Sequence, residues 1–299
     1  MNFHRLRVFY TVARLGSFSR AGDELYTSQP NVSKHIRQLE AELGTALFHR
    51  LGGGIELTDA GRAVYRYAQQ VFNLTAEMQR TLAELEGLER GFLRLGASST
   101  PGLYLLPEMM SVFSRHYPGL EVSLAIGNSG QVVEEALAGK LDLGFVGGFS
   151  EGVGLQVQPF VADEVVLIAP SGHRLAGRAD VSPGELAGET FVVREAGSST
   201  RQTMEAVLNA LHISPQRTLE MRGCEAVKRA VAAGLGLSFV SSYAIDLELG
   251  QRVLSVLRGP GLDLLRQLYM ISRKDTRLSR PALAFLAFAH KRVTAAGFG

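Results

Sequence analysis

The pattern of apolar residues changes near residue 90, and this change constrains the fold more than any other feature. Before it, apolar residues recur at helical spacing. From Gly91 onward, short apolar runs alternate with helical stretches. A chain of 299 residues is also too long for one small core, since domains usually hold roughly 100–200 residues. We therefore expect an all-α N-terminal part followed by an α/β part.

Composition and charge narrow the class of protein. The hydrophobic fraction of 46% and charged fraction of 20% fit a folded chain and argue against disorder. The net charge of +2 excludes a strongly basic nucleic-acid coat, so any nucleic-acid contact must be local. The single cysteine, Cys224, cannot form an internal disulfide, which suits a reducing compartment. The longest uncharged run, 230–245, is too short for a membrane span, and the N-terminus lacks the apolar stretch of a signal peptide. We expect a cytoplasmic protein.

The first sixty residues predict three short helices and a hairpin. Gly16 and Gly44 end the first and third helices, and Pro30 stands in the first turn of the third. The third helix runs to Leu43 and is apolar along one stripe and polar on the opposite face. A glycine turn at 52–54 precedes a short strand, which is typical of the wing of a winged helix. The helices fit a helix-turn-helix, whose second helix lays polar side chains on base edges. They fit a generic three-helix domain with solvated lysine and arginine equally well.

A specific resemblance decides between these alternatives. The segment 9–61 resembles the N-terminal domain of LysR-type transcriptional regulators. The matching residues are Phe9, 16–19, Ala21, Leu25, 28–30, 32–33, Ile36, 39–40, 43–44, 47–48, Arg50, 57–58 and Gly61. The resemblance implies a winged helix-turn-helix that docks residues 29–37 in the major groove. Two features depart from the family: Gly22 replaces a usual alanine, which should cost the helix about 1 kcal/mol, and the wing is poor in arginine.

The chemistry of the third helix suggests individual roles. Gln29 and Asn31 can pair with adenine, and Lys34 can reach guanine. The serines and arginines suit phosphate contacts, which position the domain without reading sequence. The expected DNA-binding residues are Ser28, Gln29, Pro30, Asn31, Ser33, Lys34, Arg37 and Arg50.

A long helix from Asp59 towards Glu89 carries a seven-residue repeat. Its apolar series is typical of a helix paired with another helix and is flawed only at Thr81. The alternative is a long helix packed on its own domain. The helix also resembles the dimerising linker of LysR-type regulators, and the expected dimer contacts are Val64, Tyr67, Val71, Leu74, Met78 and Leu85. Residues 1–66 hold nine basic and six acidic side chains, so one copy should bind DNA weakly and several copies should act together.

The remaining two hundred residues predict an α/β sensor. Strands alternate with helices, which implies a parallel sheet in two units with a ligand cleft between them. The stretch resembles the LysR substrate-binding domain, which is related in fold to type 2 periplasmic binding proteins. Its clearest marks are 106–107, 139–144 and 231–237. We expect a DNA-binding domain at 1–58, a linker helix at 59–90 and an effector domain at 91–299. Within the effector domain, subdomain I spans about 91–162 plus 270–299, and subdomain II about 163–269.

Two identical Ser-Ser-Thr runs suggest where a ligand binds. Residues 98–100 and 198–200 each follow a strand and open a helix, and Ser129 stands at a third such junction. A helix N-terminus with free N–H groups favours an anion, although capping is the commonest task of serine and threonine. The expected effector-binding residues are Ser98, Ser99, Thr100, Ser129, Ser198, Ser199, Thr200 and Arg201. The second run is also similar to one in relatives that regulate carbon fixation or sulfur metabolism.

Enzyme motifs are missing from the sequence. The seven histidines show no metal-ligand spacing, and neither a phosphate-binding loop nor a dinucleotide fingerprint is present. Cys224 is either a buried small residue or, ahead of a helix, a reactive thiol. We expect no catalysis, metal or cofactor. The alternative is a small-molecule binding protein or enzyme with a dimerising helical arm, which salt-sensitive DNA binding would exclude. Expected partners are double-stranded DNA, further copies in a homotetramer, RNA polymerase and a small anionic effector, with no membrane.

Overall fold

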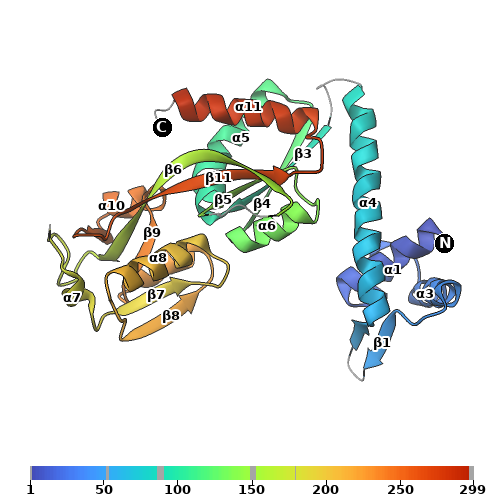
Figure 1. The fold of residues 1–299 in the computed structure, drawn as a ribbon, viewed down its shortest axis with the longest axis horizontal. Coiled ribbons are helices and arrows are strands. Elements are labelled where there is room, and N and C mark those ends of the chain that lie inside the picture. The colour runs from blue at the N-terminus through green and yellow to red at the C-terminus, as the bar shows by residue number, and fades with distance from the viewer. Residues whose placement is uncertain (1, 52–53, 86–90, 149–152, 179, 296–299) are drawn as a thin grey trace. The chain divides into compact units, whose positions relative to one another are not determined.

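The computed structural model describes residues 2–51, 54–85, 91–148, 153–178 and 180–295 (Figure 1). The chain divides into two compact units, Met1–Gln79 and Arg80–Gly299. Each unit has its own hydrophobic core, so each is described separately.

The first unit contains the three expected helices and the hairpin. Its elements are α1 (Phe3–Leu15), α2 (Phe18–Glu24), α3 (Gln29–Leu43), β1 (Phe48–Leu51), β2 (Gly54–Leu57) and α4 (Asp59–Leu85). Gly16 and Gly44 end α1 and α3 with left-handed φ of 61° and 70°, which glycine adopts without steric cost. The hydroxyl of Ser17 caps α2 by accepting the Arg20 N–H at 3.3 Å.

Apolar faces of all four helices meet in the core of this unit. Phe9 of α1 and Leu39 of α3 are fully buried, and Ala68 of α4 packs against the same cluster. The rings of Tyr10 and Tyr65 stack with centroids 5.1 Å apart. The start of α4 is therefore part of the domain that carries α3.

The second unit alternates strands and helices along most of its length. Its lobe I contains β3 (Gly91–Ser98), the π-helical turn η1 (Pro101–Leu105), α5 (Leu106–His116), β4 (Leu120–Gly127), α6 (Ser129–Leu137), β5 (Leu143–Gly147) and α11 (Arg280–Ala295). Its lobe II contains α7 (Pro183–Leu186), β7 (Thr190–Arg194), α8 (Ser199–Ala210), β8 (Arg217–Met221), α9 (Cys224–Ala232), β9 (Ser238–Ser241), η2 (Ser242–Ala244), α10 (Asp246–Gly250) and β10 (Leu254–Leu257). Two long strands, β6 (Leu155–Pro170) and β11 (Leu264–Arg273), belong to both lobes.

The seven-stranded sheet of this unit is mixed, so the expectation of a parallel sheet holds only in part; β7 and β8 form a separate parallel pair. The strand order is β10-β6-β11-β5-β3-β4, and β9 also pairs with β6. Strand β3 is parallel to β4 and β5, as the alternation of strands and helices predicts. Strand β11 runs antiparallel to both β5 and β6, because each long strand passes from one lobe into the other and the chain returns on its neighbour.

The two lobes have separate cores joined by the long strands. Phe113, Phe145 and Phe285 are buried in lobe I, and Phe191 and Phe239 are buried in lobe II. Strand β6 supplies Phe160 and Val161 to the first core and Val165 and Leu167 to the second. Figure 1 shows both long strands running between the helices of one lobe and those of the other. Among the described residues, no helix is long and apolar enough to cross a membrane.

Candidate functional sites

Helix α3 presents its predicted polar face to solvent. Ser28, Gln29, Pro30 and Asn31 are exposed at its N-terminal end, and Lys34 and Arg37 are exposed further along. Ser33 is half-buried between them. The apolar stripe at Val32, Ile36 and Leu39 is buried against the core. The helix is thus held from behind, with its polar side chains free to meet a partner.

Local hydrogen bonds orient the two amide side chains at the start of α3. Gln29 Nε2 donates to Ser33 Oγ at 3.1 Å, and Asn31 Nδ2 donates to Thr27 Oγ1 at 2.8 Å. Each amide uses one N–H in this way and keeps its oxygen and second N–H. Those are the two groups that bidentate pairing with adenine requires.

The turn between α2 and α3 is tighter than expected and explains Gly22. Gly22 is buried, and a Cβ on it would lie 2.8 Å from the carbonyl oxygen of Thr27. The Thr27 N–H donates to the Gly22 carbonyl at 2.9 Å. The glycine therefore permits a close approach of two backbones and is not merely a weak helix former. The same turn holds Tyr26 fully exposed at a φ of 51°, a residue that sequence reasoning passed over.

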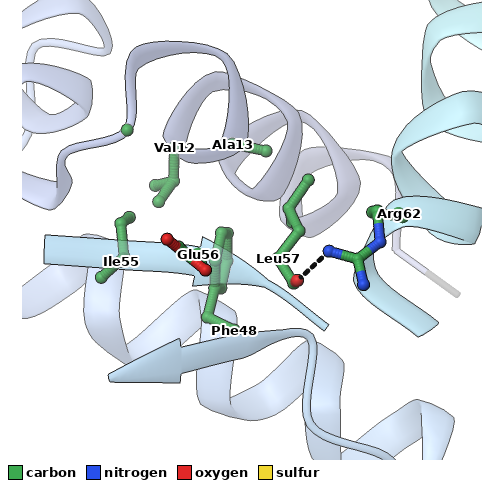
Figure 2. A pocket seen from close by; sticks show the side chains of 8 residues that line it. Val12, Ala13, Phe48, Ile55, Glu56, Leu57 and Arg62 are labelled. Atoms are coloured by element: carbon green, nitrogen blue, oxygen red, sulfur yellow. Dashed lines mark hydrogen bonds between the residues drawn. The ribbon is translucent and has the colours of Figure 1, made fainter. Parts of the chain in front are cut away.

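The wing is seated on α1 by apolar side chains. Phe48 of β1, Ile55 and Leu57 of β2, and Val12 and Ala13 of α1 line a shallow cavity of about 290 Å³. Figure 2 shows these side chains between α1 and the hairpin. Arg62 of α4 donates to the Leu57 carbonyl at 2.8 Å (Figure 2). The base of the hairpin is fixed on both sides. Its tip at 52–53 and the side chain of Arg50 lie outside the described part.

One face of α4 carries an exposed apolar stripe. The exposed fractions of Tyr67, Leu74 and Met78 are 68%, 67% and 55%. Val71 is exposed beside them, whereas Val64 is half-buried and packs on the unit's own core. The side chain of Leu85 lies outside the described residues. Four of the six expected dimer contacts therefore face solvent in the single chain.

In the second unit the two Ser-Ser-Thr runs lie buried where the lobes meet. Ser98 ends β3 in lobe I, and Ser99 and Thr100 follow it. Ser198 caps α8 in lobe II, and Ser199 and Thr200 open that helix; all six are less than 10% exposed. The hydroxyl of Ser129 at the start of α6 lies 3.2 Å from Ser199 Oγ and 3.4 Å from the Gly147 carbonyl oxygen. Hydroxyls from both lobes thus lie close together. Ser198 has a different role, because its Oγ caps α8 by accepting the Arg201 N–H at 3.4 Å.

Main-chain groups also join the lobes beside these hydroxyls. The Gly130 N–H donates to the Gly197 carbonyl at 3.1 Å. Asn128 Nδ2 donates to the Ala196 carbonyl at 3.2 Å. The same Asn128 caps α6 by accepting the Gln131 N–H at 3.0 Å, so one side chain anchors a helix and touches the opposite lobe.

A buried arginine of lobe II reaches the serine run of lobe I. Arg194, at the end of β7, donates from Nη2 to Ser99 Oγ at 3.2 Å and is only 6% exposed. Its Nε donates to Glu195 at 2.8 Å. Burial disfavours the ionised form of Glu195, but hydrogen bonds from Arg194 and from the Gly223 N–H outweigh it and hold the Glu195 pKa at about 2. Glu195 is therefore an anion that balances the charge of Arg194.

A second buried ion pair lies next to Thr200. Arg266 of β11 contacts Asp163 of β6 at 2.7 Å, and both side chains are almost completely buried. Arg266 Nη1 also donates to Thr200 Oγ1 at 3.2 Å, and Ser241 Oγ donates to Asp163 at 2.5 Å. The pair links both long strands to the N-terminus of α8.

A cavity of about 550 Å³ opens between the lobes at Arg194. Its polar wall consists of Ser99, Asn128, Gln131, Glu134, Arg194, Glu195, Glu220 and Arg222. Of the expected effector residues only Ser99 lines it; Thr100, Ser129, Ser199 and Thr200 lie deeper, in the hydrogen-bonded contact between the lobes. A volume of this size and polarity suits a small polar molecule.

Comparisons with known proteins agree with the architecture. Residues 3–62 match the family model described as bacterial regulatory helix-turn-helix protein, lysR family, and residues 86–294 match the LysR substrate binding domain. This chain belongs to the LysR family of transcriptional regulators. This chain is 40% identical to the RuBisCO operon transcriptional regulator of Allochromatium vinosum over 96% of its own length and 95% of that protein. It is 35% identical to the transcriptional activator CmpR of Synechocystis, with 96% and 95% covered.

Solved structures show the same fold. The CcmR regulatory domain of Synechocystis PCC6803 in complex with 2-PG matches with a TM-score of 0.65 and 30% identity, covering 68% of this chain and 97% of that one. Full-length CbnR complexed with its target DNA matches with a TM-score of 0.72 and 23% identity, covering 98% and 99%. The expected fold class is confirmed: a helix-turn-helix unit precedes an effector-binding unit of two lobes. The LysR-type regulator is a DNA-binding transcriptional regulator with an effector-binding domain.

Arg201 is paired with carboxylates, and Cys224 matches its buried alternative and not the reactive one. Arg201 donates to Glu205 at 2.8 Å, to Glu220 at 2.7 Å and to the Arg194 carbonyl at 3.0 Å. Cys224 is buried, and burial raises the pKa of its thiol, which does not favour the reactive thiolate. Within the described ranges, no three His, Cys, Asp or Glu side chains are placed to hold a metal ion.

Sequence reasoning missed the arginines of the inter-lobe site. Arg194 ends a strand and directly precedes the Glu195 that opens the serine loop, so its position was a usable signal. Arg266 and Arg222 gave none, because each is brought to the site by strand pairing or by a turn far along the chain.

Proposed function

We propose that this LysR-type regulator controls genes of carbon fixation in response to a small anionic effector bound between its lobes. Several relatives support the first part, since their names refer to RuBisCO regulation at 33–40% identity over at least 94% of this chain. The CcmR domain, at 30% identity, was solved with 2-PG, which supports the second part.

The observation that carries the proposal is the buried guanidinium of Arg194 at the inter-lobe cavity. It already donates to Ser99 Oγ, and Arg222 lines the same wall. A carboxylate or phosphate in the cavity can accept charge-assisted hydrogen bonds from such groups. Glu134, Glu195 and Glu220 also line the cavity, so an anion is favoured only where its charge lies against the arginine side.

Assembly and location follow from the DNA-reading role. We infer that two chains pair through the α4 stripe and that two such dimers form a tetramer, which presents several α3 helices to one promoter. Effector binding would favour one arrangement of the lobes and so change how the DNA is held. Contact with RNA polymerase and a place in the bacterial cytoplasm fit this role.

Two measurements test the proposal separately. Genome-wide footprinting of the purified protein at about 0.15 M salt should enrich sites beside carbon-fixation genes. Enrichment beside sulfur-metabolism genes would instead favour the role suggested by the 33% identical CysL of Bacillus subtilis. Enrichment beside other genes would contradict the carbon-fixation proposal.

Calorimetry with 2-PG as the probe tests the effector site. We expect binding by the unmodified protein and roughly tenfold or greater weakening in Arg194→Met, because one charge-assisted hydrogen bond contributes about 1.5–3 kcal/mol. Thr100→Val and Thr200→Val test the deeper hydroxyls in the same way. A Thr203→Val variant is the control, since its hydroxyl only bonds the Ser199 carbonyl within α8. Equal affinity in the Arg194 variant would overturn the site.

A further inference from the structure

Tyr26 has a strained backbone conformation that no burial of its ring offsets. Its φ is 51°, in the left-handed region that a bulky side chain rarely adopts. Its exposed fraction is 98%, so the ring gains almost no burial in exchange. Strained residues of this kind persist where the surrounding structure fixes them, and they gather at functional sites.

The surrounding turn fixes this conformation from both sides. The Tyr26 N–H donates to the Asp23 carbonyl at 3.2 Å, and the Thr27 N–H donates to the Gly22 carbonyl at 2.9 Å. Gly22 lets the backbone of Thr27 approach α2 closely. The ring is therefore held out from the turn by its backbone and not by packing.

Tyr26 stands at the end of α3 that carries the exposed polar residues. It precedes Ser28 and Gln29 by two and three positions, and both are exposed. Of the two acidic residues just before it, Glu24 pairs with Arg14, and Asp23 is exposed on α2. A phenol is uncharged at neutral pH and donates one hydrogen bond, so it can approach a phosphate beside these groups.

We propose that the Tyr26 hydroxyl donates a hydrogen bond to a backbone phosphate of DNA next to the α3 groove site. The inference rests on α3 being the helix that enters the major groove. The contact positions α3 without reading a base, because phosphate contacts carry no sequence information. It also accounts for a large, exposed side chain in a strained turn position where glycine or asparagine would fit more easily.

The test compares DNA affinity of the full-length protein and two variants by fluorescence anisotropy. Tyr26→Phe removes only the hydroxyl, and Tyr26→Asn suits the left-handed φ better. One duplex carries a footprinted site and the other a scrambled sequence. We expect both variants to weaken binding roughly tenfold or more per bound subunit on both duplexes, because each subunit loses one hydrogen bond to a charged group. We also expect Tyr26→Asn to melt at an equal or higher temperature than the unmodified protein.

Each contrary outcome is distinct. Equal affinity of Tyr26→Phe and the unmodified protein would overturn the contact. Weakening on the specific duplex alone would overturn the phosphate assignment in favour of a base contact. Because the scrambled duplex needs no knowledge of the target genes, a failure of the carbon-fixation proposal leaves this test intact.

Discussion

Gly22 permits the tight turn after α2, although glycine is a poor residue for the interior of a helix. Helix propensity alone favours alanine at this position by about 1 kcal/mol. The close approach of the Thr27 carbonyl oxygen, 2.8 Å from where an alanine Cβ would stand, opposes it. Overpacking of this kind usually costs about 1–3 kcal/mol, and a backbone atom cannot move aside as a side chain can.

We therefore expect Gly22→Ala to destabilise the first unit by about 1 kcal/mol net and to weaken DNA binding, because the turn sets the start of α3. Thermal unfolding and anisotropy would measure the two effects. Gly250→Ala is the matched control, since open space surrounds that position at the end of α10 and no loss of stability is expected. A more stable Gly22→Ala protein would show that the turn can relax.

Helical period predicted which side chains of α3 face solvent, and the repeated serine runs predicted part of the polar contact between the lobes. The polar positions of α3 follow from helical period alone, because a helix fixes which side chains share a face. The serine runs were found by their repetition at strand ends. Arg222 and Arg266 were not, since nothing local marks a side chain that tertiary pairing brings to a site.

At the level of elements, the apolar stripe of α4 stays exposed to solvent in the single chain. Tyr67, Leu74 and Met78 recur at spacings of seven and four along one face. Paired helices bury such a stripe in their common seam.

We expect Leu74→Glu to reduce the dimer to monomer at micromolar concentration, because it places a charge in that seam. Sedimentation or light scattering would report the mass. Gln70→Glu adds the same charge on an exposed position beside the stripe and should leave the mass unchanged. If both variants keep the mass of the unmodified protein, the seam lies elsewhere.

Element prediction failed where strands are long and polar. The apolar run at 165–169 predicts a strand for the second half of β6 alone, because Asp163 and Glu164 interrupt the pattern that precedes it. Asp163 is nonetheless buried against Arg266, so its charge marks an ion pair between strands and not a loop. Missing this half of β6 also concealed the antiparallel return of β11 and hence the mixed sheet.

For the whole molecule, pairing should govern how DNA binding depends on salt. Each neutralised phosphate releases counterions, and the logarithm of the binding constant falls with the logarithm of salt by about 0.9 per phosphate for duplex DNA. Two first units on one duplex contact twice as many phosphates as one.

We expect the slope for Leu74→Glu to be about half that of the unmodified protein between roughly 50 and 200 mM salt. Anisotropy titrations at several salt concentrations give both slopes, and Gln70→Glu should retain the steeper one. Equal slopes for a monomeric Leu74→Glu protein would mean that a single unit makes all the phosphate contacts.

The contact between the lobes includes one hydrogen bond between backbone atoms, from Gly130 to Gly197, beside a cavity wall made largely of side chains. Backbone hydrogen bonds are indifferent to which side chains stand nearby. Substitutions in the wall at Glu134 and Arg222 should therefore leave this backbone bond in place. We expect a library randomised at Glu134 and Arg222 to change which small molecules bind while the lobes keep this contact, which makes this unit a practical starting point for engineered reporters.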